Sequence, residues 1–327
     1  MNLGSPDSTS VSDVRKYLNE FLMDGRVIDS PLLLRTILVK GIITPFRAPK
    51  SAEAYHSIWT KDGSPLVHIT WQLRDALQKI VKEPVEVAMR YGNPTMKAAY
   101  DKLLGKNPDL QEVVLLPLYP HYAMSSYETA VAHAEEVHKK GGYPFRIKTI
   151  PPFYNNPDYI TALAASIKPY LGNGHLLFSY HSIPERHIHK SDTTGHHCLK
   201  VENCCSVASP AHKTCYRHQC YETTRLVAAA LRLAPEEYSV SFQSKLGRSA
   251  WLTPATTTRM DELPKEGIKK LMVVCPSFVS DCLETLEEVA IREKENFMKA
   301  GGEEYTFIPC MNTQTAWVET VKGWVEG

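Results

Sequence analysis

Two segments of this sequence place side chains that can move protons or bind a cation directly after buried apolar runs. His181 follows the run LLFSY, and a neutral imidazole can accept a proton or bind a divalent metal. In SFVSDCLETLEE, Asp281, Glu284 and Glu288 occur at i, i+3 and i+7, on one face near a helix start. The structural alternatives are a hydrogen-bonded loop histidine and a solvated acidic face in which Glu288 pairs with Arg292. The apolar residues that lead into both segments favour a crevice.

Five of the eight cysteines lie in the segment HHCLKVENCCSVASPAHKTCYRHQC, residues 196–220. They are Cys198, Cys204, Cys205, Cys215 and Cys220. The opening MNLGSPDSTS has no export signal, and in a reducing compartment clustered thiols are more often metal ligands than disulfides. Four thiolates suit an iron–sulfur cluster or zinc, and the histidines of the same segment keep zinc open. Free thiols are the third alternative.

Basic and aromatic side chains at other loop tips could contact an anionic or flat ligand. The candidate anchors for an anionic substrate are Arg47, Lys50, Arg90 and Tyr91. Candidates for an aromatic wall, with core packing as the alternative, are Tyr119, Tyr122 and Trp251. The sequence has no G-x-x-x-x-G-K-[ST], G-x-G-x-x-G or G-x-S-x-G motif, which removes the usual signals for nucleotide binding and serine hydrolases.

Short apolar runs alternate with longer amphipathic segments, which is typical of βα units with parallel sheets. The runs that predict strands are Val85–Met89, Val113–Leu118, Leu176–Ser179, Val240–Phe242, Leu271–Cys275 and Tyr305–Ile308. Each run is followed by a polar, aromatic or Gly/Pro-rich tip. Because ligands of open α/β sheets bind outside the carboxyl ends of the strands, we expect these tips to carry the chemistry.

Length and composition predict a soluble protein of two domains. The 327 residues are 43% hydrophobic and 22% charged, with a formal net charge of +1 that gives no sign of nucleic-acid binding. The turn-rich segment TIPPFYNNPDY suggests a boundary between domains of residues 1–152 and 153–327. No apolar run reaches roughly 18 residues. The nearest, residues 30–46, predicts a buried helix or, alternatively, a lip on a membrane surface or an apolar ligand.

Eight motifs in order show that the chain resembles the ferrochelatase family over nearly its whole length. They are NLGSP, FRAPKSAEAY, GSPL, MRYGNP, LYPHY, LFSYHSIPER, SFQSKLGRSAWLTP and SFVSDCLETLEE. The resemblance implies two Rossmann-like domains flanking a porphyrin cleft, with a lip at about residues 24–50 and a last segment that packs back on the first domain. It implies insertion of Fe²⁺ into protoporphyrin IX, giving protohaem and two protons. Open alternatives are coproporphyrin III, another tetrapyrrole and metal pair, or a non-catalytic tetrapyrrole carrier or iron–sulfur sensor.

The site residues of the family match individual positions of this chain. His181 matches the histidine at the metal-insertion centre, and Glu284 matches the carboxylate across the cleft from it, so both would contact substrate Fe²⁺. Glu288 and Asp281 would form a path for protons or metal, but the next position of the acidic row is Arg292, which is normally acidic in the family. Positions near the propionates or in the pocket lining are Arg47, Lys50, Trp251 and Leu3.

The resemblance also suggests a role for the cysteine-rich insert, residues 196–220. Certain bacterial members hold a [2Fe–2S] cluster through four ligands of an internal segment that follows the catalytic histidine. An arrangement with ligands in a C-terminal extension is excluded, because no cysteine follows Cys310. The expected ligands are Cys198, Cys205, Cys215 and Cys220, with Cys204 as substitute. Since metal insertion moves no electrons, we expect a structural or sensing role, with zinc as the alternative metal.

The expected partners are the two substrates, porphyrin and ferrous iron, and no nucleic acid. We expect a monomer or homodimer in the cytoplasm, with peripheral contact to the inner face of the membrane. Family members usually carry several apolar residues before NLGSP, so we expect either a trimmed first strand or a longer natural start.

Overall fold

The computed structural model describes residues 1–245 and 249–327, so the motif SFQSKLGRSAWLTP lies partly outside the described residues. The chain forms two compact units. Unit 1 comprises Met1–Leu118, Met124–Pro151 and Val321–Gly327, and unit 2 comprises Tyr119–Ala123 and Pro152–Thr320. No helix in the described ranges is long and apolar enough to cross a membrane.

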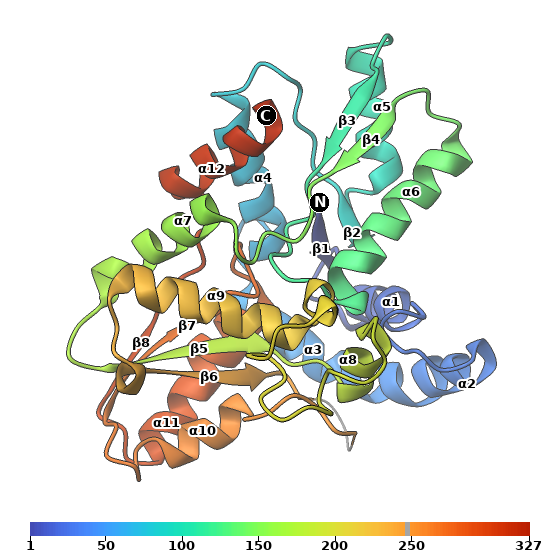
Figure 1. The fold of residues 1–327 in the computed structure, drawn as a ribbon. Coiled ribbons are helices and arrows are strands. Elements are labelled where there is room, and N and C mark those ends of the chain that lie inside the picture. The colour runs from blue at the N-terminus through green and yellow to red at the C-terminus, as the bar shows by residue number, and fades with distance from the viewer. Residues whose placement is uncertain (246–248) are drawn as a thin grey trace. The chain divides into compact units, whose positions relative to one another are not determined.

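Unit 1 contains four short strands and the helices between them (Figure 1). Its elements are β1 (Asn2–Ser5), α1 (Val11–Leu22), α2 (Leu32–Thr36), the π-helix η1 (Ile37–Ile43), α3 (Thr44–Ile58), α4 (Pro65–Gln78), β2 (Met89–Gly92), α5 (Met96–Lys106), β3 (Glu112–Leu115), the π-helix η2 (Met124–Glu128), α6 (Thr129–Gly141) and β4 (Arg146–Thr149).

The strands of unit 1 pair in parallel, β1 with β2 and β3 with β4. Met1 joins the pairs, because its amino group donates to Leu116 O at 2.7 Å and its carbonyl accepts from Leu118 N at 2.8 Å. The motif NLGSP needs its glycine, because a Cβ on Gly4 would lie 1.8 Å from the Tyr91 carbonyl oxygen. Gly4 also has φ of +106°, which L-residues rarely adopt.

Unit 2 is built on one four-stranded sheet (Figure 1). Its elements are α7 (Pro157–Ile167), the 3₁₀-helix η3 (Lys168–Tyr170), β5 (His175–His181), α8 (Glu185–Ser191), the 3₁₀-helix η4 (Pro210–Lys213), α9 (Tyr216–Leu231), the 3₁₀-helix η5 (Pro235–Glu237), β6 (Tyr238–Gln243), α10 (Thr256–Glu262), β7 (Lys270–Val274), the π-helix η6 (Glu284–Glu293), α11 (Lys294–Lys299), β8 (Glu304–Phe307) and α12 (Thr315–Glu326), whose last turns belong to unit 1.

The sheet of unit 2 has the order β6-β5-β7-β8, and all its pairs are parallel. Helices α7 and α9 cover one face, and α10 and α11 cover the other (Figure 1). Beneath the second face, apolar side chains form a core that includes Leu177, Val273, Val289 and Phe297. Parallel strands covered on both faces read as apolar runs, which is why β5 and β7 are visible in the sequence. The predicted α/β fold of parallel sheets flanked by helices is confirmed.

Three strands differ from the predicted strand runs. β1 was not among those runs and was expected only from the family resemblance. β4 was not predicted, because RIKT at an exposed edge alternates apolar and charged residues and contains no apolar run. β2 begins at Met89 rather than Val85, because its pairing with β1 begins at Asn2 opposite Met89. The other predicted strands agree with the structure to within a few residues at each end.

The apolar segment of residues 30–46 is not a buried helix. It forms α2, η1 and the start of α3, and within it Val39 is fully buried. Leu33 and Phe46 are 73% and 77% exposed, and further exposed apolar side chains in the segment are Leu32, Leu34, Ile37, Leu38 and Ile42. The buried-helix interpretation is therefore wrong, since apolar composition alone does not distinguish a core helix from an exposed apolar surface.

Candidate functional site

His181 is the last residue of β5, at the carboxyl end of the unit 2 sheet. On one side it pairs with Gln243 of β6. On the other side, pairing with β7 stops three residues earlier, at Phe178 opposite Val274. Side chains therefore complete the hydrogen bonding of the His181 backbone. Ser277 Oγ accepts from His181 N at 3.1 Å, and the Tyr216 hydroxyl donates to His181 O at 2.8 Å.

The imidazole of His181 is held in one tautomer. Its Nδ1 lies 2.6 Å from the carbonyl oxygen of Ser182. Because a carbonyl can only accept, Nδ1 carries the proton, and the lone pair of the neutral ring is on Nε2. The ring is half-buried, and Phe278 contacts it edge-on at 6.2 Å between centroids. His181 can thus act as a base or as a metal ligand through Nε2.

The Glu288 carboxylate of η6 lies in the electrostatic environment of His181. Burial raises the pKa of the Glu288 carboxyl, and a hydrogen bond from Ser244 and the charge of His181 oppose that rise. Ser244 donates to Glu288 through its backbone N at 2.8 Å and through its hydroxyl. Gln243 Nε2 donates to the backbone carbonyl of Glu284 at 3.2 Å, which ties the helix start to β6. Glu284 itself is half-buried.

The arrangement of these acids is not a solvated α-helical face. Residues 284–293 form a π-helix, a rare element that often marks functional sites. Arg292 donates to Glu287 at 2.8 Å, while the carboxylate of Glu288 accepts from Ser244. The alternative in which Glu288 forms an ion pair with Arg292 is therefore wrong.

Asp281 is occupied by a structural network at the entry to η6. Its carboxylate accepts from Thr285 Oγ1 at 3.0 Å, from Cys310 N at 3.2 Å and from Asn312 Nδ2 at 2.7 Å. The side chain is 5% exposed. This network anchors the turn that presents Glu284, so the geometry gives Asp281 a positioning role. Its predicted part in a proton or metal path stays a prediction.

All three aromatic candidates belong to unit 2. Trp251 forms a backbone bridge to Pro184, three residues after His181, and its indole N–H is buried without a hydrogen-bond partner among the described residues. Tyr119 is 8% exposed. It begins the segment Tyr119–Ala123, in which Tyr122 N donates to Gln219 Oε1 of α9 at 2.7 Å. Trp251 is thus the best placed of the three to line a ligand site near His181.

Three other candidates lie on unit 1. Arg47 and Lys50 are three residues apart on α3, next to the exposed Phe46, and Arg47 is half-buried while Lys50 is exposed. Leu3 is a half-buried residue of β1. Both cations can meet an anionic group beside an apolar surface, and their contact with a substrate stays a prediction.

Arg90 and Tyr91 are engaged inside unit 1 by Asp24. Arg90 Nη2 forms an ion pair with Asp24 Oδ2, and the Arg90 guanidinium also stacks over the Tyr91 ring at 4.2 Å. The hydroxyl of Tyr91 donates to the same carboxylate at 3.0 Å, and Thr129 donates to it as well. Tyr91 is fully buried. The geometry therefore gives this pair a structural role inside unit 1, and substrate contact by either residue stays a prediction.

Four of the five thiols in residues 196–220 lie together. Cys215 interacts with Cys198 and with Cys205, and Cys205 interacts with Cys204 as well. Arg217 Nη1 lies 3.2 Å from Cys205 Sγ and 3.8 Å from Cys204 Sγ. The neighbouring Cys215 thiol, together with burial, raises the pKa of the Cys205 thiol. We call these four residues the thiol group.

Cys220 interacts with Tyr216 as well as with Cys205 of the thiol group. Its side chain is fully buried, and burial raises its pKa well above the usual value. In the described part of the chain, no three or more His, Cys, Asp or Glu side chains are arranged to hold a metal ion. The thiols thus have the number and chemistry of a metal site, but not its geometry.

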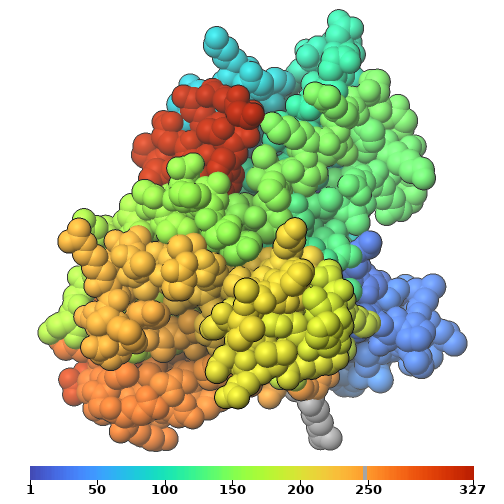
Figure 2. All heavy atoms as spheres, in the orientation of Figure 1, coloured from blue at the N-terminus to red at the C-terminus, as the bar shows by residue number. Residues whose placement is uncertain are grey.

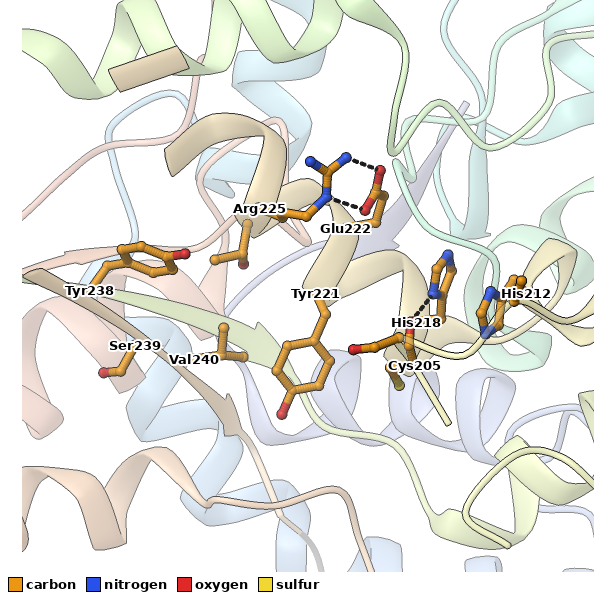
Figure 3. A pocket seen from close by; sticks show the side chains of 12 residues that line it. Cys205, His212, His218, Tyr221, Glu222, Arg225, Tyr238, Ser239 and Val240 are labelled. Atoms are coloured by element: carbon orange, nitrogen blue, oxygen red, sulfur yellow. Dashed lines mark hydrogen bonds and ion pairs between the residues drawn. The ribbon is translucent and has the colours of Figure 1, made fainter. Parts of the chain in front are cut away.

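Three histidines support the backbone around these thiols. The cysteine-rich segment forms one region of the surface (yellow, Figure 2). His197 Nε2 and His212 Nε2 lie 2.7 and 2.9 Å from Cys204 O, and His218 Nδ1 lies 2.7 Å from Cys205 O. The rings of His212 and His218 stack at 3.5 Å beside a pocket of about 740 Å³ (Figure 3). Since these nitrogens donate to carbonyls, the three histidines support the backbone.

The start of the segment depends on Asp192, at the end of α8. Its carboxylate accepts from the backbone N–H groups of His197 and Cys198, each at 2.8 Å. Burial acts to raise the pKa of Asp192, but hydrogen bonds from Thr194, Cys198 and His197 lower it below the usual value. The acid is therefore charged at neutral pH and fixes the loop that carries Cys198.

Sequence reasoning did not identify Ser277, Ser244 and Tyr216, which hold His181 and Glu288. Ser244 and Ser277 lie in the tips QSKLGRSAWL and PSFVSDCLETLEE, so the rule that tips carry chemistry contained a signal for them. Tyr216 lies among the cysteines, where nothing in its spacing relates it to a histidine 35 residues earlier.

Parallel sheets with helices on both faces, and a histidine and carboxylates beyond the strand ends, define a chelatase-type α/β protein. The solved structure of SirB from Bacillus subtilis with Fe³⁺ shares this fold, with a TM-score of 0.55 and 14% identity over 79% of this chain and 88% of that chain. A family model described as Ferrochelatase matches residues 1–327.

Curated relatives agree with that match. The ferrochelatase of Ectopseudomonas mendocina is 49% identical over 98% of this chain and 94% of its own length. The ferrochelatase of Opitutus terrae is 48% identical over 100% of this chain and 96% of its own length. The chain belongs to the ferrochelatase family, lyases of haem biosynthesis whose substrates are a porphyrin and ferrous iron.

Proposed function

We propose that this chain inserts Fe²⁺ into protoporphyrin IX, giving protohaem with release of two pyrrole protons, and that His181 is the group at the reacting centre. The observation that carries the proposal is the Nδ1–H bond from His181 to Ser182 O, which leaves Nε2 with a lone pair at the end of β5. A porphyrin hides its N–H groups in the ring plane, so a positioned base must remove both protons as the metal enters.

Glu284 and Glu288 supply the negative charge that this chemistry needs. An incoming dication exchanges its water for protein ligands, and oxygen and imidazole donors both suit Fe²⁺. Glu284 lies at the start of η6, and Glu288 lies one turn further along, where the charge of His181 acts on its pKa. The raised pKa of Glu288 favours a role as a proton acceptor that returns protons to solvent. We assign Glu284 as a metal contact and Glu288 as a proton relay.

On unit 1, Arg47 and Lys50 are the proposed partners of the porphyrin propionates. Their spacing on α3 puts two cations near each other beside the apolar side chains of residues 32–46. Guanidinium and ammonium groups bind carboxylates through charge-assisted hydrogen bonds. Leu3 and Trp251 are proposed to line the porphyrin site.

A turnover assay tests the reaction and its substrate. Catalytic amounts of the purified chain, mixed with Zn²⁺ or Fe²⁺ and protoporphyrin IX, should give the metalloporphyrin spectrum over many turnovers. Coproporphyrin III is the comparison, because its four carboxylates require more cationic partners than the two of protoporphyrin IX. Faster turnover of coproporphyrin III would replace the proposed substrate, and stoichiometric binding without turnover would indicate a carrier.

We also propose that the cysteine-rich insert binds a [2Fe–2S] cluster, with zinc as the alternative. The thiol group offers four soft ligands, and the Arg217 guanidinium beside Cys204 and Cys205 can offset the charge that thiolates bring. The interaction of Cys220 with Tyr216, together with that of Cys204 with Cys205, favours Cys204 over Cys220 as the fourth ligand. A bound cluster would hold the insert together and is assigned no part in metal insertion.

The exposed apolar side chains of residues 32–46, which we call the lip, are proposed to rest on the inner face of the cytoplasmic membrane. The lip presents Leu33 and Phe46 at more than two thirds exposure. Lys40 is exposed within it, and a cation beside an apolar surface favours anionic lipid. Both the porphyrin and the haem are apolar, so contact with a membrane would shorten their path through water.

Leu33→Glu should weaken binding to vesicles of phosphatidylglycerol and phosphatidylethanolamine. Burying a leucine side chain contributes about 1.5–3 kcal/mol, so its loss should lower the partition coefficient by about 10- to 100-fold. Co-sedimentation with vesicles measures this. The matched control is Met298→Glu, which changes an exposed apolar residue of α11 on unit 2. Equal loss in both variants, or a wild-type protein that ignores vesicles, would contradict membrane contact through the lip.

A further inference from the structure

Tyr216 lies where the cysteine-rich insert meets the end of β5. It is the first residue of α9, and Cys215 of the thiol group is the N-cap of that helix. The hydroxyl of Tyr216 donates to His181 O at 2.8 Å and lies 2.8 Å from Ser277 Oγ. It also contacts the Cys220 thiol. One phenol oxygen therefore joins the insert to the backbone of His181.

The backbone of His181 needs this support because β5 extends beyond its neighbour. Pairing of β5 with β7 ends at Phe178 opposite Val274, so none of the described strands on that side bonds the last residues of β5. Ser277 Oγ accepts from His181 N at 3.1 Å, and Tyr216 contacts Ser277 and His181 O together. Removing the phenol oxygen would leave a carbonyl without its donor and would loosen the serine that holds the N–H.

The orientation of the imidazole depends on the same stretch of backbone. The ring is fixed through Nδ1 to the carbonyl of the next residue, Ser182, at 2.6 Å. Ser182 N in turn donates to Gln243 O at 2.8 Å. A rotation of the His181 peptide would therefore displace Nε2 relative to Glu288. A displacement of about 1 Å at a reacting group can reduce the rate by about 10²-fold.

We infer that Tyr216 is a positioning residue, whose hydroxyl fixes the backbone of His181 and makes the geometry of that histidine depend on the cysteine-rich insert. The inference rests on the proposed role of His181 in metal insertion. It connects the cysteine-rich insert to metal insertion through a hydrogen bond, and this connection involves no electron transfer. The ring of Tyr216 packs edge-on against His121, with 5.8 Å between the ring centroids. A movement at the start of α9 would therefore be transmitted through Tyr216 to the end of β5.

Tyr216→Phe tests the inference, because it removes the hydroxyl and keeps the ring. We expect kcat for metal insertion to fall by about 10- to 100-fold, with the KM for porphyrin and the thermal midpoint close to those of the control. The control is Tyr180→Phe, which also removes a buried hydroxyl that joins β5 to α9, in this case through Thr224 Oγ1 at 2.8 Å. Tyr180→Phe should keep the wild-type kcat.

The outcomes separate this inference from the proposed function. Wild-type kcat in Tyr216→Phe, or equal losses in Tyr216→Phe and Tyr180→Phe, overturns the positioning role, and His181→Ala then reports separately on the histidine. If Tyr216→Phe does not fold by circular dichroism, Ser277→Ala is the second variant, since it removes the acceptor of His181 N. Ser277→Ala should lower kcat in the same way, and unchanged turnover there also overturns the inference.

Discussion

His181→Ala is expected to abolish metal insertion while porphyrin still binds. The substitution removes Nε2, the one nitrogen of the ring that keeps a lone pair, and leaves the β5–β6 pairing intact. Loss of a positioned base lowers a rate by about 10²–10⁴-fold, and the loss of a metal contact adds to this. The measurement is the rate of metalloporphyrin formation, with porphyrin binding followed separately by fluorescence quenching.

A matched control keeps this result specific. His175 lies at the other end of β5, where its Nε2 bonds Ser239 Oγ at 2.7 Å, far along the strand from the reacting end. His175→Ala should bind porphyrin and turn over at a rate close to that of the wild type. Undiminished turnover in His181→Ala would remove His181 from the reaction. Equal losses in both variants would indicate a general effect on the strand.

Cys215→Ser is expected to remove the visible absorbance of the freshly purified protein. Cys215 is the centre of the thiol group, since it contacts both Cys198 and Cys205. Wild-type protein with a [2Fe–2S] cluster should show visible bands that bleach on reduction with dithionite. A serine hydroxyl is a poor substitute for a soft thiolate, so the variant should be colourless and contain no stoichiometric iron or sulfide.

The comparison of Cys204→Ser with Cys220→Ser identifies the fourth ligand. The interaction of Cys205 with Cys204 predicts that Cys204→Ser loses or shifts the bands. Cys220 contacts Tyr216, so Cys220→Ser should keep the bands. The opposite pattern would restore Cys220 as the ligand. A colourless wild-type protein loaded with zinc would replace the cluster by a zinc site.

Buried elements with a strong pattern could be predicted from the sequence. β5 and β7 are apolar runs because helices cover both faces of their sheet, and burial on both sides excludes polar residues. The exposed edge strand β4 has no such requirement, and its alternating residues gave no apolar run. The sequence could not decide whether residues 30–46 are buried or exposed. An apolar surface that faces a partner and an apolar surface that faces the core use the same residues.

The candidate site shows the same division. His181 and Glu284 could be identified as candidate site residues, because each follows a strand at the edge where parallel strands end. The π-helix η6 could not be predicted, because a π-helical hydrogen-bond pattern leaves no distinct residue spacing in DCLETLEEVAIRE. The hydrogen-bond partners of Asp281 and Arg90 could not be identified either. They are Asn312 and Asp24, which are distant in the sequence.

The sequence by itself determined the family, the alternation of strands and helices, and the residue types available to bind metal, protons and porphyrin. Only the tertiary structure decided which of those residues meet. It left the Nε2 lone pair of His181 at the strand end, brought four thiols near one another, and put Tyr216 on the backbone of His181. The physical reason is that local patterns encode burial and period, whereas a hydrogen bond between distant residues depends on how helices and strands pack.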